Sequence, residues 1–332
     1  MNSFGRIFRV HIFGESHGIQ VGAIIDGCPA GIALTESDLE ADLARRRAGA
    51  KGTTPRKEAD IPHIVSGTVD GYTTGAPITI LFNNENTRSG DYSHLRNQPR
   101  PGHSDFVADA KFGGNNDLRG GGHFSARITL GMVAAGSIAK KILAPASFNA
   151  KLIKVGGQED VAAAVDEAIA AHDSVGGLIE CTCSGLPIGL GEPFFDSAES
   201  CISHAVFAIP AVKGIEFGSG FKAAEMRGSE HNDIILDAEG RTATNNAAGI
   251  NGGITNGNDI VFRLAIKPTS SIGVRQTTFN MQTQQMEELK IGGRHDSCVA
   301  LRAPVIVEAA AAIALADLAL IDQRTPRVYM PQ

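Results

Sequence analysis

The longest apolar run of this 332-residue chain extends from Val305 to Ile321, and it constrains the fold more than any other segment. Glu308 and Asp317 are the only charged residues within it. A run that is interrupted by two acidic side chains is poorly suited to a membrane span. It predicts a helix buried in the interior of a folded domain.

A second helix is expected downstream of Ser125, because apolar residues recur there at helical spacing. These residues are Ile128, Met132, Ala135, Ile138, Ala139 and Ile142. Small residues at positions 131, 134 and 136 would make this helix thin and would suit close packing.

Residue patterns also predict the other secondary structure of the chain. Strands are expected at 8–12, 21–26, 61–69, 77–82, 178–183 and 260–266, and helices at 35–46, 159–172 and 199–208. The Asn- and Gly-rich stretch 226–258 is interpreted as a long loop. Helices and strands do not alternate regularly and no linker is evident. We therefore expect one mixed domain over residues 1–332 and not a doubly wound sheet.

The charge balance restricts the partners of this protein. The net charge is -6, and the chain contains no Trp and three Tyr. General binding of polyanions and stacking on single-stranded nucleic acid are therefore disfavoured. A local basic cluster consists of Arg45, Arg46, Arg47, Lys51, Arg56 and Lys57. It indicates either a small anionic ligand or a solvated helix end, and the sequence leaves both open.

The cysteines and the N-terminus bear on the cellular compartment. The chain has five cysteines and no C-x-x-C pair, and Cys181 and Cys183 alternate within an expected strand. This pattern is typical of buried thiols in a reducing compartment. The N-terminus lacks the pattern of a signal peptide, so we expect a cytoplasmic protein that associates with no membrane.

A polar stretch at residues 100–129 contains the sequence RPGHSDFVADAKFGGNNDLRGGGHFSARIT. Its three consecutive glycines, 120–122, would let backbone N–H groups approach a ligand closely. A helix beginning just after them would direct its positive end at that ligand. The stretch predicts an anion site, the alternative being an ordinary loop before a capped helix.

Three further polar islands border apolar segments: GESHG at 14–18, KPTSS at 267–271 and GRHD at 293–296. Together with the central stretch they gather basic, imidazole and carboxylate side chains, which suits an anionic ligand and acid–base chemistry. A metal site at His17, His103, His123 and His295 is an alternative, but no H-x-x-x-H or H-E-x-x-H spacing supports it. A nucleophilic Ser16 is disfavoured because GESHG does not match G-x-S-x-G.

These motifs resemble the chorismate synthase family. The ordered motifs are GESHG, RPGHSDF, KFG, RGGG with SARIT, IPAVKG, GSEHND, GGITNG, KPTSSI and GRHDSC, and they cover the chain from Phe8 to about Leu320. The resemblance implies an α+β fold, a β-α-β sandwich in which antiparallel sheets flank a helical layer. It also implies a homotetramer.

The resemblance further implies a lyase of the shikimate pathway. The expected reaction is a 1,4-anti elimination of phosphate and a C6 hydrogen from 5-enolpyruvylshikimate 3-phosphate, which gives chorismate. The family uses reduced FMN with no net redox change. We expect an external flavin reductase to supply it, with NADPH only as an indirect source of electrons.

Roles follow from the matching motif positions. His17 matches an acid near the leaving phosphate, His103 a residue beside the flavin, and Asp296 an aspartate that assists proton transfer. Arg46 matches a contact to the substrate anion that has also been linked to a nicotinamide nucleotide. Further substrate contacts are expected at Lys51, Arg127 and Arg294. Flavin contacts are expected at Ser125, Ala126, Ala211, Gly252, Lys267, Pro268, Thr269, Ser270, Ser271 and Arg294.

The chain departs from the usual family pattern at a few positions. GGHFSARIT replaces GGRSSARET, so His123, Phe124 and Ile128 stand where Arg, Ser and Glu are common. Imidazole is only partly charged at neutral pH, so we expect a weaker positive charge near the flavin phosphate. At Lys51 and Gly52 an expected arginine is displaced. The alternative functions are a flavin enzyme with net redox turnover and a silent anion-binding protein.

Overall fold

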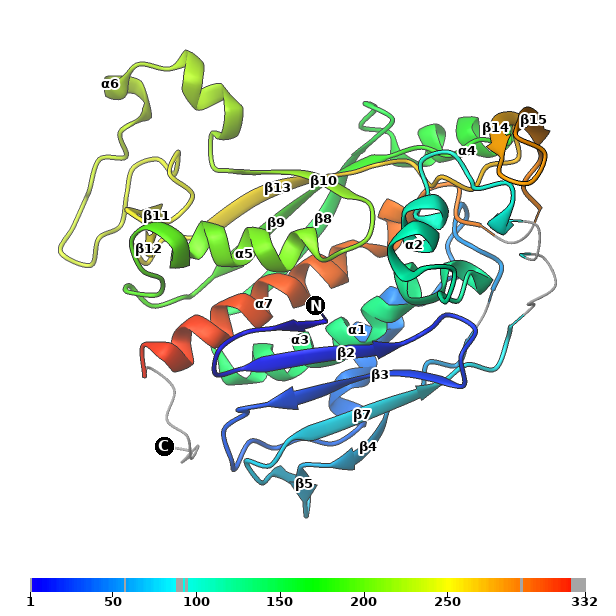
Figure 1. Ribbon diagram of the computed structural model, residues 1–332. Coiled ribbons are helices and arrows are strands. Elements are labelled where there is room, and N and C mark those ends of the chain that lie inside the picture. Colours follow the sequence, from blue (N-terminus) through cyan, green and yellow to red (C-terminus); the bar gives the residue numbers. More distant parts are fainter. Residues whose placement is uncertain (1, 57, 88–91, 93–94, 293–294, 324–332) are drawn as a thin grey trace.

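One face of the protein is an antiparallel sheet built mainly from the N-terminal quarter of the chain (Figure 1). The computed structural model describes residues 2–56, 58–87, 92, 95–292 and 295–323. The strand order is β1 (Ser3–Phe4), β2 (Arg9–Gly14), β3 (Gln20–Asp26), β7 (Ile78–Asn83) and β4 (His63–Ser66). Alternate residues of β7 face the interior, since Ile78, Ile80 and Phe82 are fully buried, as expected of a strand with one face on the core. A small hairpin, β5 (Thr68–Val69) and β6 (Tyr72–Thr73), follows β4.

The opposite face is a second antiparallel sheet. Its order is β10 (Val212–Phe217), β13 (Ile260–Ile266), β9 (Gly177–Ser184) and β8 (Ser147–Val155). The strands predicted at 178–183 and 260–266 are thus confirmed. Cys181 and Cys183 are buried free thiols on β9, as the alternation indicated.

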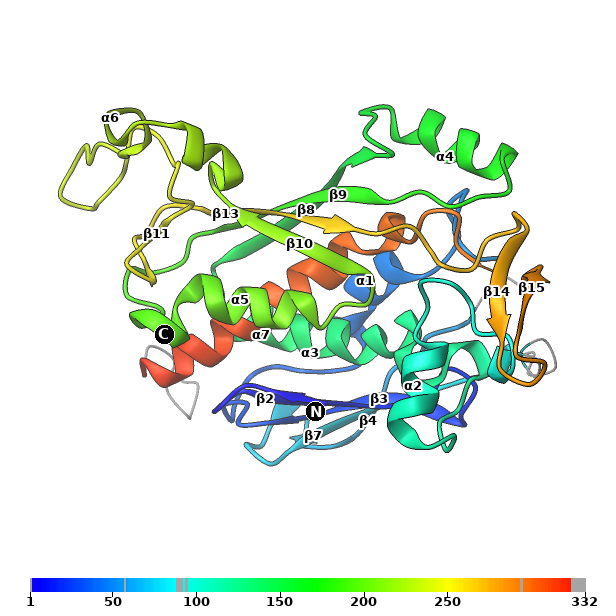
Figure 2. The same cartoon turned by 45° about the horizontal axis from the view of Figure 1, so that its top comes forward.

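A helical layer lies between the two sheets, as Figure 2 shows. It contains α3 (Thr129–Ile142) and α7 (Pro304–Ile321), with α1 (Ser37–Arg46) and α5 (Ala198–Phe207) beside them. Helices α3 and α7 pack closely because a Cβ at Gly136 would lie only 2.3 Å from the Cβ of Ala309. The α+β fold with antiparallel sheets around a helical layer is confirmed.

Helix α7 is the predicted buried helix. Among the described residues it alone has the length and mean hydropathy, 2.1, that a membrane span requires, but 89% of it is buried inside the protein. Its two acidic residues are both engaged. The carboxylate of Glu308 accepts hydrogen bonds from Arg45, Lys140 and the Ala150 N–H, while Asp317 accepts from the N–H groups of residues 6–8.

Smaller elements surround these layers. They are helices α2 (Asp105–Phe112), α4 (Val161–Ala170) and α6 (Gly228–His231), and hairpins β11 (Ile250–Asn251) with β12 (Ile254–Thr255) and β14 (Gln276–Asn280) with β15 (Gln285–Leu289). Short 3₁₀ helices are η2 (Arg119–Phe124), η3 (Ala126–Ile128), η4 (Phe194–Asp196), η5 (Gly220–Glu225) and η6 (Val299–Arg302). The stretch 226–258 is therefore not all loop, because it includes α6, β11 and β12.

The sheet topology determines where the polar islands meet. Strands β2 and β7 both pair antiparallel with β3, so both end at the same edge of the first sheet. GESHG follows β2, and residues 84–87 follow β7. The glycine-rich segment before α3 reaches the same edge, since the Ser16 N–H donates to the Gly122 carbonyl at 3.0 Å.

Candidate active site

A cavity of about 410 Å³ lies where these segments converge. Its volume is in the range of small-molecule sites. It brings together most of the residues predicted from the sequence. The predicted residues that line it are His17, Arg46, His103, Ser125, Ala126, Arg127, Ala211, Lys267, Pro268, Thr269, Ser270, Ser271 and Asp296.

His17 stands on the turn that ends β2. The Gly18 N–H closes this turn onto the Glu15 carbonyl at 3.0 Å. Gly120 packs against the imidazole so closely that a Cβ there would lie 2.7 Å from the His17 ring. The φ of Gly120 is +59°, a conformation that side chains disfavour. The glycine run therefore makes room for His17 as well as shaping the loop.

His103 belongs to a second cluster, at the start of α2. Its Nδ1 lies 2.7 Å from Asp105 Oδ1, and Arg100 contacts both oxygens of the same carboxylate at 2.7 Å. Arg100 Nη1 also donates to Ser271 Oγ at 3.0 Å, which links the cluster to the KPTSS segment. Burial by itself would raise the pKa of Asp105, but hydrogen bonds from Arg100 and His103 outweigh burial and lower it.

Asp296 is held from two sides. Its Oδ1 accepts the Thr54 backbone N–H at 2.8 Å, and its Oδ2 accepts from Arg302 Nη2 at 2.7 Å. Arg302 also lines the cavity, and its buried Nε has no hydrogen-bond partner among the described residues. Neighbouring His295 lines the cavity too, and burial lowers the pKa of its imidazole, which favours the neutral ring at pH 7.

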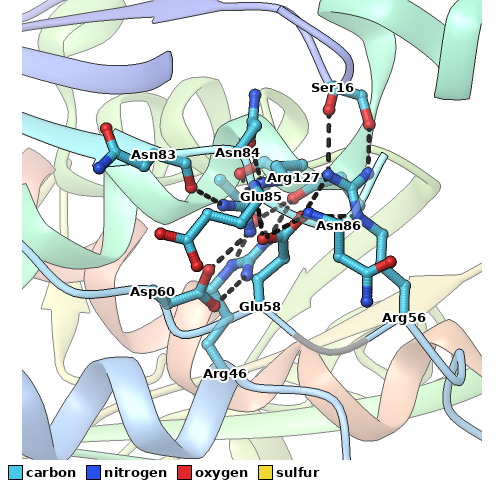
Figure 3. Close-up of polar contacts among 12 residues, drawn as sticks. Ser16, Arg46, Arg56, Glu58, Asp60, Asn83, Asn84, Glu85, Asn86 and Arg127 are labelled. Atoms are coloured by element: carbon cyan, nitrogen blue, oxygen red, sulfur yellow. Dashed lines mark hydrogen bonds and ion pairs between the residues drawn. The ribbon is translucent and has the colours of Figure 1, made fainter. Parts of the chain in front are cut away.

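The two central arginines share one carboxylate (Figure 3). Arg127 Nη1 lies 2.6 Å from Asp60 Oδ1, and Arg46 Nη1 lies 3.5 Å from Asp60 Oδ2. Arg46 also donates to Thr129 Oγ1 at 3.2 Å and to the Ala126 carbonyl at 2.8 Å. Burial lowers the pKa of Arg46 to about 9, so it still carries its charge at neutral pH.

The KPTSS segment forms another wall of the cavity. Lys267 Nζ donates to the Gly102 carbonyl at 2.5 Å, and Ser270 Oγ donates to the same oxygen at 2.8 Å. Thr269 Oγ1 is buried and has no partner within the described residues. A second cavity, of about 480 Å³, adjoins this wall and shares the lining residues Phe124, Ser125, Pro210, Ala211 and Lys267.

Known proteins resemble this chain over nearly its whole length. Residues 8–320 match the sequence profile of chorismate synthase. The chorismate synthase of Chitinophaga pinensis is 64% identical over 330 residues, which cover 99% of each chain. That of Dehalococcoides mccartyi is 44% identical over 359 residues, covering 98% of this chain and 99% of the relative. A solved structure entitled "Crystal Structure of Chorismate Synthase" has a TM-score of 0.75 at 27% identity, covering 96% of this chain and 93% of the other.

The chain belongs to the chorismate synthase family. It is therefore an enzyme, a lyase that forms chorismate in the shikimate pathway and serves aromatic amino-acid biosynthesis. This class replaces the alternatives of a silent binding protein and of a flavin enzyme with net redox turnover.

His123 departs from the usual family arginine, and the structure shows how its side chain is used. Its Nδ1 lies 2.9 Å from the Gly14 carbonyl oxygen, and its Nε2 lies 2.9 Å from Asn2 Oδ1. The imidazole lines the second cavity and not the first. It ties the end of β2 to the N-terminal segment. The expected weaker charge near a flavin phosphate stays a prediction.

Two predicted site residues, Lys51 and Gly252, do not line this cavity, and a third lies outside the described residues. Lys51 is exposed and pairs with Asp166 at 2.6 Å, so its position does not support the predicted substrate contact. Gly252 lies in the β11–β12 turn, at the opposite end of the molecule from α2 (Figure 1), so one chain does not bring it to the cavity. Arg294 lies outside the described residues.

Sequence reasoning missed several polar residues of the cavity. These are Glu58, Asp60, Arg100 and Arg302. Ser16 was considered only as a nucleophile, and Arg56 was named only within a basic cluster. Asp60 carried no local signal, because it acts through Arg46 and Arg127, which lie 14 and 67 positions away. Glu58 pairs with Arg56, two positions away. Within the described residues, no group of three or more His, Cys, Asp and Glu side chains could hold a metal ion.

Proposed function

We propose that this enzyme converts 5-enolpyruvylshikimate 3-phosphate into chorismate and phosphate by a 1,4-anti elimination, with reduced FMN bound and no net redox change. The observation that carries this proposal is the cavity itself. It combines His17, His103 and Asp296 with a concentrated positive charge.

The charge of the lining suits a substrate with three anionic groups. Among the lining residues that the structure describes, six cationic side chains accompany three carboxylates, an excess of three positive charges in a chain of net charge -6. The cations are Arg46, Arg56, Arg100, Arg127, Lys267 and Arg302, and the carboxylates are Glu58, Asp60 and Asp296. Desolvated arginines with fixed orientation bind phosphate and carboxylate strongly.

The KPTSS wall fits the requirements of a flavin. Thr269 Oγ1 is a buried polar atom without a partner among the described residues, and Ser125, Ala211 and Lys267 line both adjoining cavities. We propose that Ser125, Ala126, Ala211 and residues 267–271 hold reduced FMN there. Reduced FMN held there would supply electron density for cleavage of the allylic C–O bond, with no net redox change.

The residues of the chain would provide proton handling and orientation. We assign His17 as the acid that donates a proton to the departing phosphate oxygen. Asp296, fixed through Thr54 and Arg302, would assist movement of the C6 hydrogen. The arginines would hold the anionic groups of the substrate in a fixed orientation, since correct placement of the reacting groups alone lowers the activation barrier substantially.

The supply of electrons and the cellular context belong to the same proposal. Arg46, the position linked to a nicotinamide nucleotide, has donors engaged by Asp60, Thr129 and the Ala126 carbonyl. We propose that NADPH is only an indirect source of electrons and that an external flavin reductase supplies the reduced FMN. We also propose that the enzyme is cytoplasmic and works as a homotetramer.

An anaerobic assay tests the proposal. The purified protein is mixed with 5-enolpyruvylshikimate 3-phosphate and photoreduced FMN, and chorismate absorbance and phosphate release are followed together. Equal amounts of both products, many turnovers per flavin and no net flavin oxidation are expected. Product formation that consumes one reduced flavin per turnover, or no product from folded protein that binds FMN, would contradict it.

A further inference from the structure

We propose that Asn84 is a positioning residue, which locks the turn that carries His17 to the side chain of Arg127. The inference rests on the proposed function, in which His17 acts as the acid. Asn84 follows directly after β7, and no sequence motif drew attention to it.

One amide group of Asn84 holds both ends of the His17 turn. Its Nδ2 donates to the Gly18 carbonyl at 2.8 Å and to the Glu15 carbonyl at 3.1 Å. The backbone N–H of Asn84 also donates to the Ile19 carbonyl at 3.0 Å. These three bonds bracket His17 on either side in the chain.

The other atom of the same amide faces the substrate arginines. Asn84 Oδ1 accepts from Arg127 Nε at 2.5 Å, while Arg127 Nη2 donates to the Asn83 carbonyl at 3.0 Å. Arg127 in turn shares Asp60 with Arg46. A continuous chain of polar contacts therefore runs from the His17 turn to both central arginines, and Asn84 is the link between them.

A second support holds the same turn from the side of Arg56. Arg56 donates to Ser16 Oγ at 2.9 Å and to the Ser16 carbonyl at 3.1 Å. Its partner Glu58 accepts the backbone N–H groups of Glu85 and Asn86 at 3.0 and 3.2 Å. Because this support remains when Asn84 is changed, such a variant should shift the turn and leave the site assembled.

The chemistry of the amide makes the substitution informative. Asn84→Asp keeps an acceptor for Arg127 but cannot donate to the two carbonyls when ionised. Asn83 supplies a matched control one residue away. Its side chain accepts from Gln20 Nε2 at 2.8 Å, and Asn83→Ala retains the main-chain carbonyl that Arg127 uses.

The test is a double-mutant cycle with His17, with kcat and the KM for 5-enolpyruvylshikimate 3-phosphate measured anaerobically. We expect Asn84→Asp to lower kcat about 10- to 100-fold, because a displacement of about 1 Å can cost that much, with a KM change below about threefold. In a His17→Ala background, Asn84→Asp should lower kcat by less than about a further twofold, since the effects of coupled residues are not additive. Asn83→Ala should change neither constant.

An equal loss of kcat in both backgrounds, an unchanged kcat or an effect on KM alone would overturn the inference. If His17→Ala is too slow to measure, the ¹⁵N signals of the His17 imidazole provide a second readout. They should move in Asn84→Asp and stay in place in Asn83→Ala. If Asn84→Asp fails to fold, Asn84→Ser takes its place. It should likewise lower kcat and leave KM nearly unchanged. Wild-type protein that makes no chorismate would refute the proposed function instead.

Discussion

At the scale of single residues, the candidate site depends on a few side chains that are positioned by residues with positive φ angles. Gly120 at φ +59° leaves room for the His17 ring, and Asp60 at φ +52° places one carboxylate between two arginines. A residue other than glycine in the left-handed region costs free energy, and such sites cluster where function requires them. His17 and Asp60 are therefore positioned by backbone conformations that the rest of the fold maintains.

His17→Ala should lower kcat by about 10² to 10⁴-fold, because it removes the proposed general acid. The variant should keep its Tm and its FMN affinity, since the imidazole packs against Gly120 and the edge of the Tyr92 ring and does not belong to the hydrophobic core. Anaerobic turnover, thermal unfolding and FMN titration measure the three quantities.

His11→Ala is a suitable control for this prediction. His11 is an exposed residue of β2 whose Nδ1 contacts Ser3 Oγ at 2.6 Å, away from the cavity. Its loss should change turnover by less than about twofold. Near-normal turnover in His17→Ala would remove His17 from its role.

At the scale of elements, α7 carries a buried charge that ties the layers together. Glu308 is 1% exposed and accepts from Arg45 on α1, Lys140 on α3 and the Ala150 N–H on β8. Burial by itself would raise the pKa of Glu308, but hydrogen bonds from Arg45 and Lys140 outweigh it and lower the pKa below 4.5. One carboxylate thus joins two helices and a strand of the second sheet to α7.

Glu308→Gln should lower the free energy of unfolding at pH 7 by about 3 kcal/mol, because the partner cations lose their buried counter-charge. The folded-state pKa lies below the unfolded value, so the charge stabilises fully above about pH 4.5 and less as pH falls through the folded pKa. The difference between wild type and variant should therefore shrink in acid. Urea unfolding at pH 7 and at pH 3.5 measures it.

Glu159→Gln controls for the loss of an ordinary surface charge. Glu159 is 83% exposed and lies 3.5 Å from Lys154, so this substitution should change stability by less than about 0.5 kcal/mol. If Glu308→Gln lowered the free energy of unfolding equally at both pH values, the packing of the Glu308 side chain and not its charge would account for its contribution to stability.

At the scale of the whole molecule, an arm around α6 extends away from the layers (Figure 1). It presents three consecutive apolar side chains to solvent, Ile234, Ile235 and Leu236, which are 68%, 69% and 63% exposed. Nearby Phe221 is 83% exposed. Contiguous exposed apolar residues mark interaction surfaces, which supports the proposed assembly of several copies.

Light scattering of the wild-type protein should give about four times the chain mass of 34.7 kDa. The double variant Ile235→Asp with Leu236→Lys should give a smaller assembly, because it places charges on an apolar contact. Met286→Lys, an exposed apolar position on β15 at the other end of the molecule, should leave the mass unchanged. A wild-type monomer, or an unchanged mass in the double variant, would contradict this role of the arm.

Much of this architecture was predictable because it depends on neighbours in sequence. The period of apolar residues predicted α7, α3 and strand β13, and the polar islands predicted where the cavity wall would come from. Helix boundaries shifted by a few residues, since α1 begins at Ser37 and α4 at Val161. The interpretation of 226–258 as loop missed α6 and the β11–β12 hairpin, whose elements are too short to show a period.

The tertiary structure alone decided which side chains meet. Glu308 contacts Arg45 from 263 positions away, and Asn84 holds the Glu15 carbonyl from 69 positions away. These contacts arise because β2 and β7 end at one edge of a sheet and α7 packs against α1, which no local pattern encodes. A sequence period reports one face of one element, whereas a hydrogen bond between elements requires the packing of the whole chain.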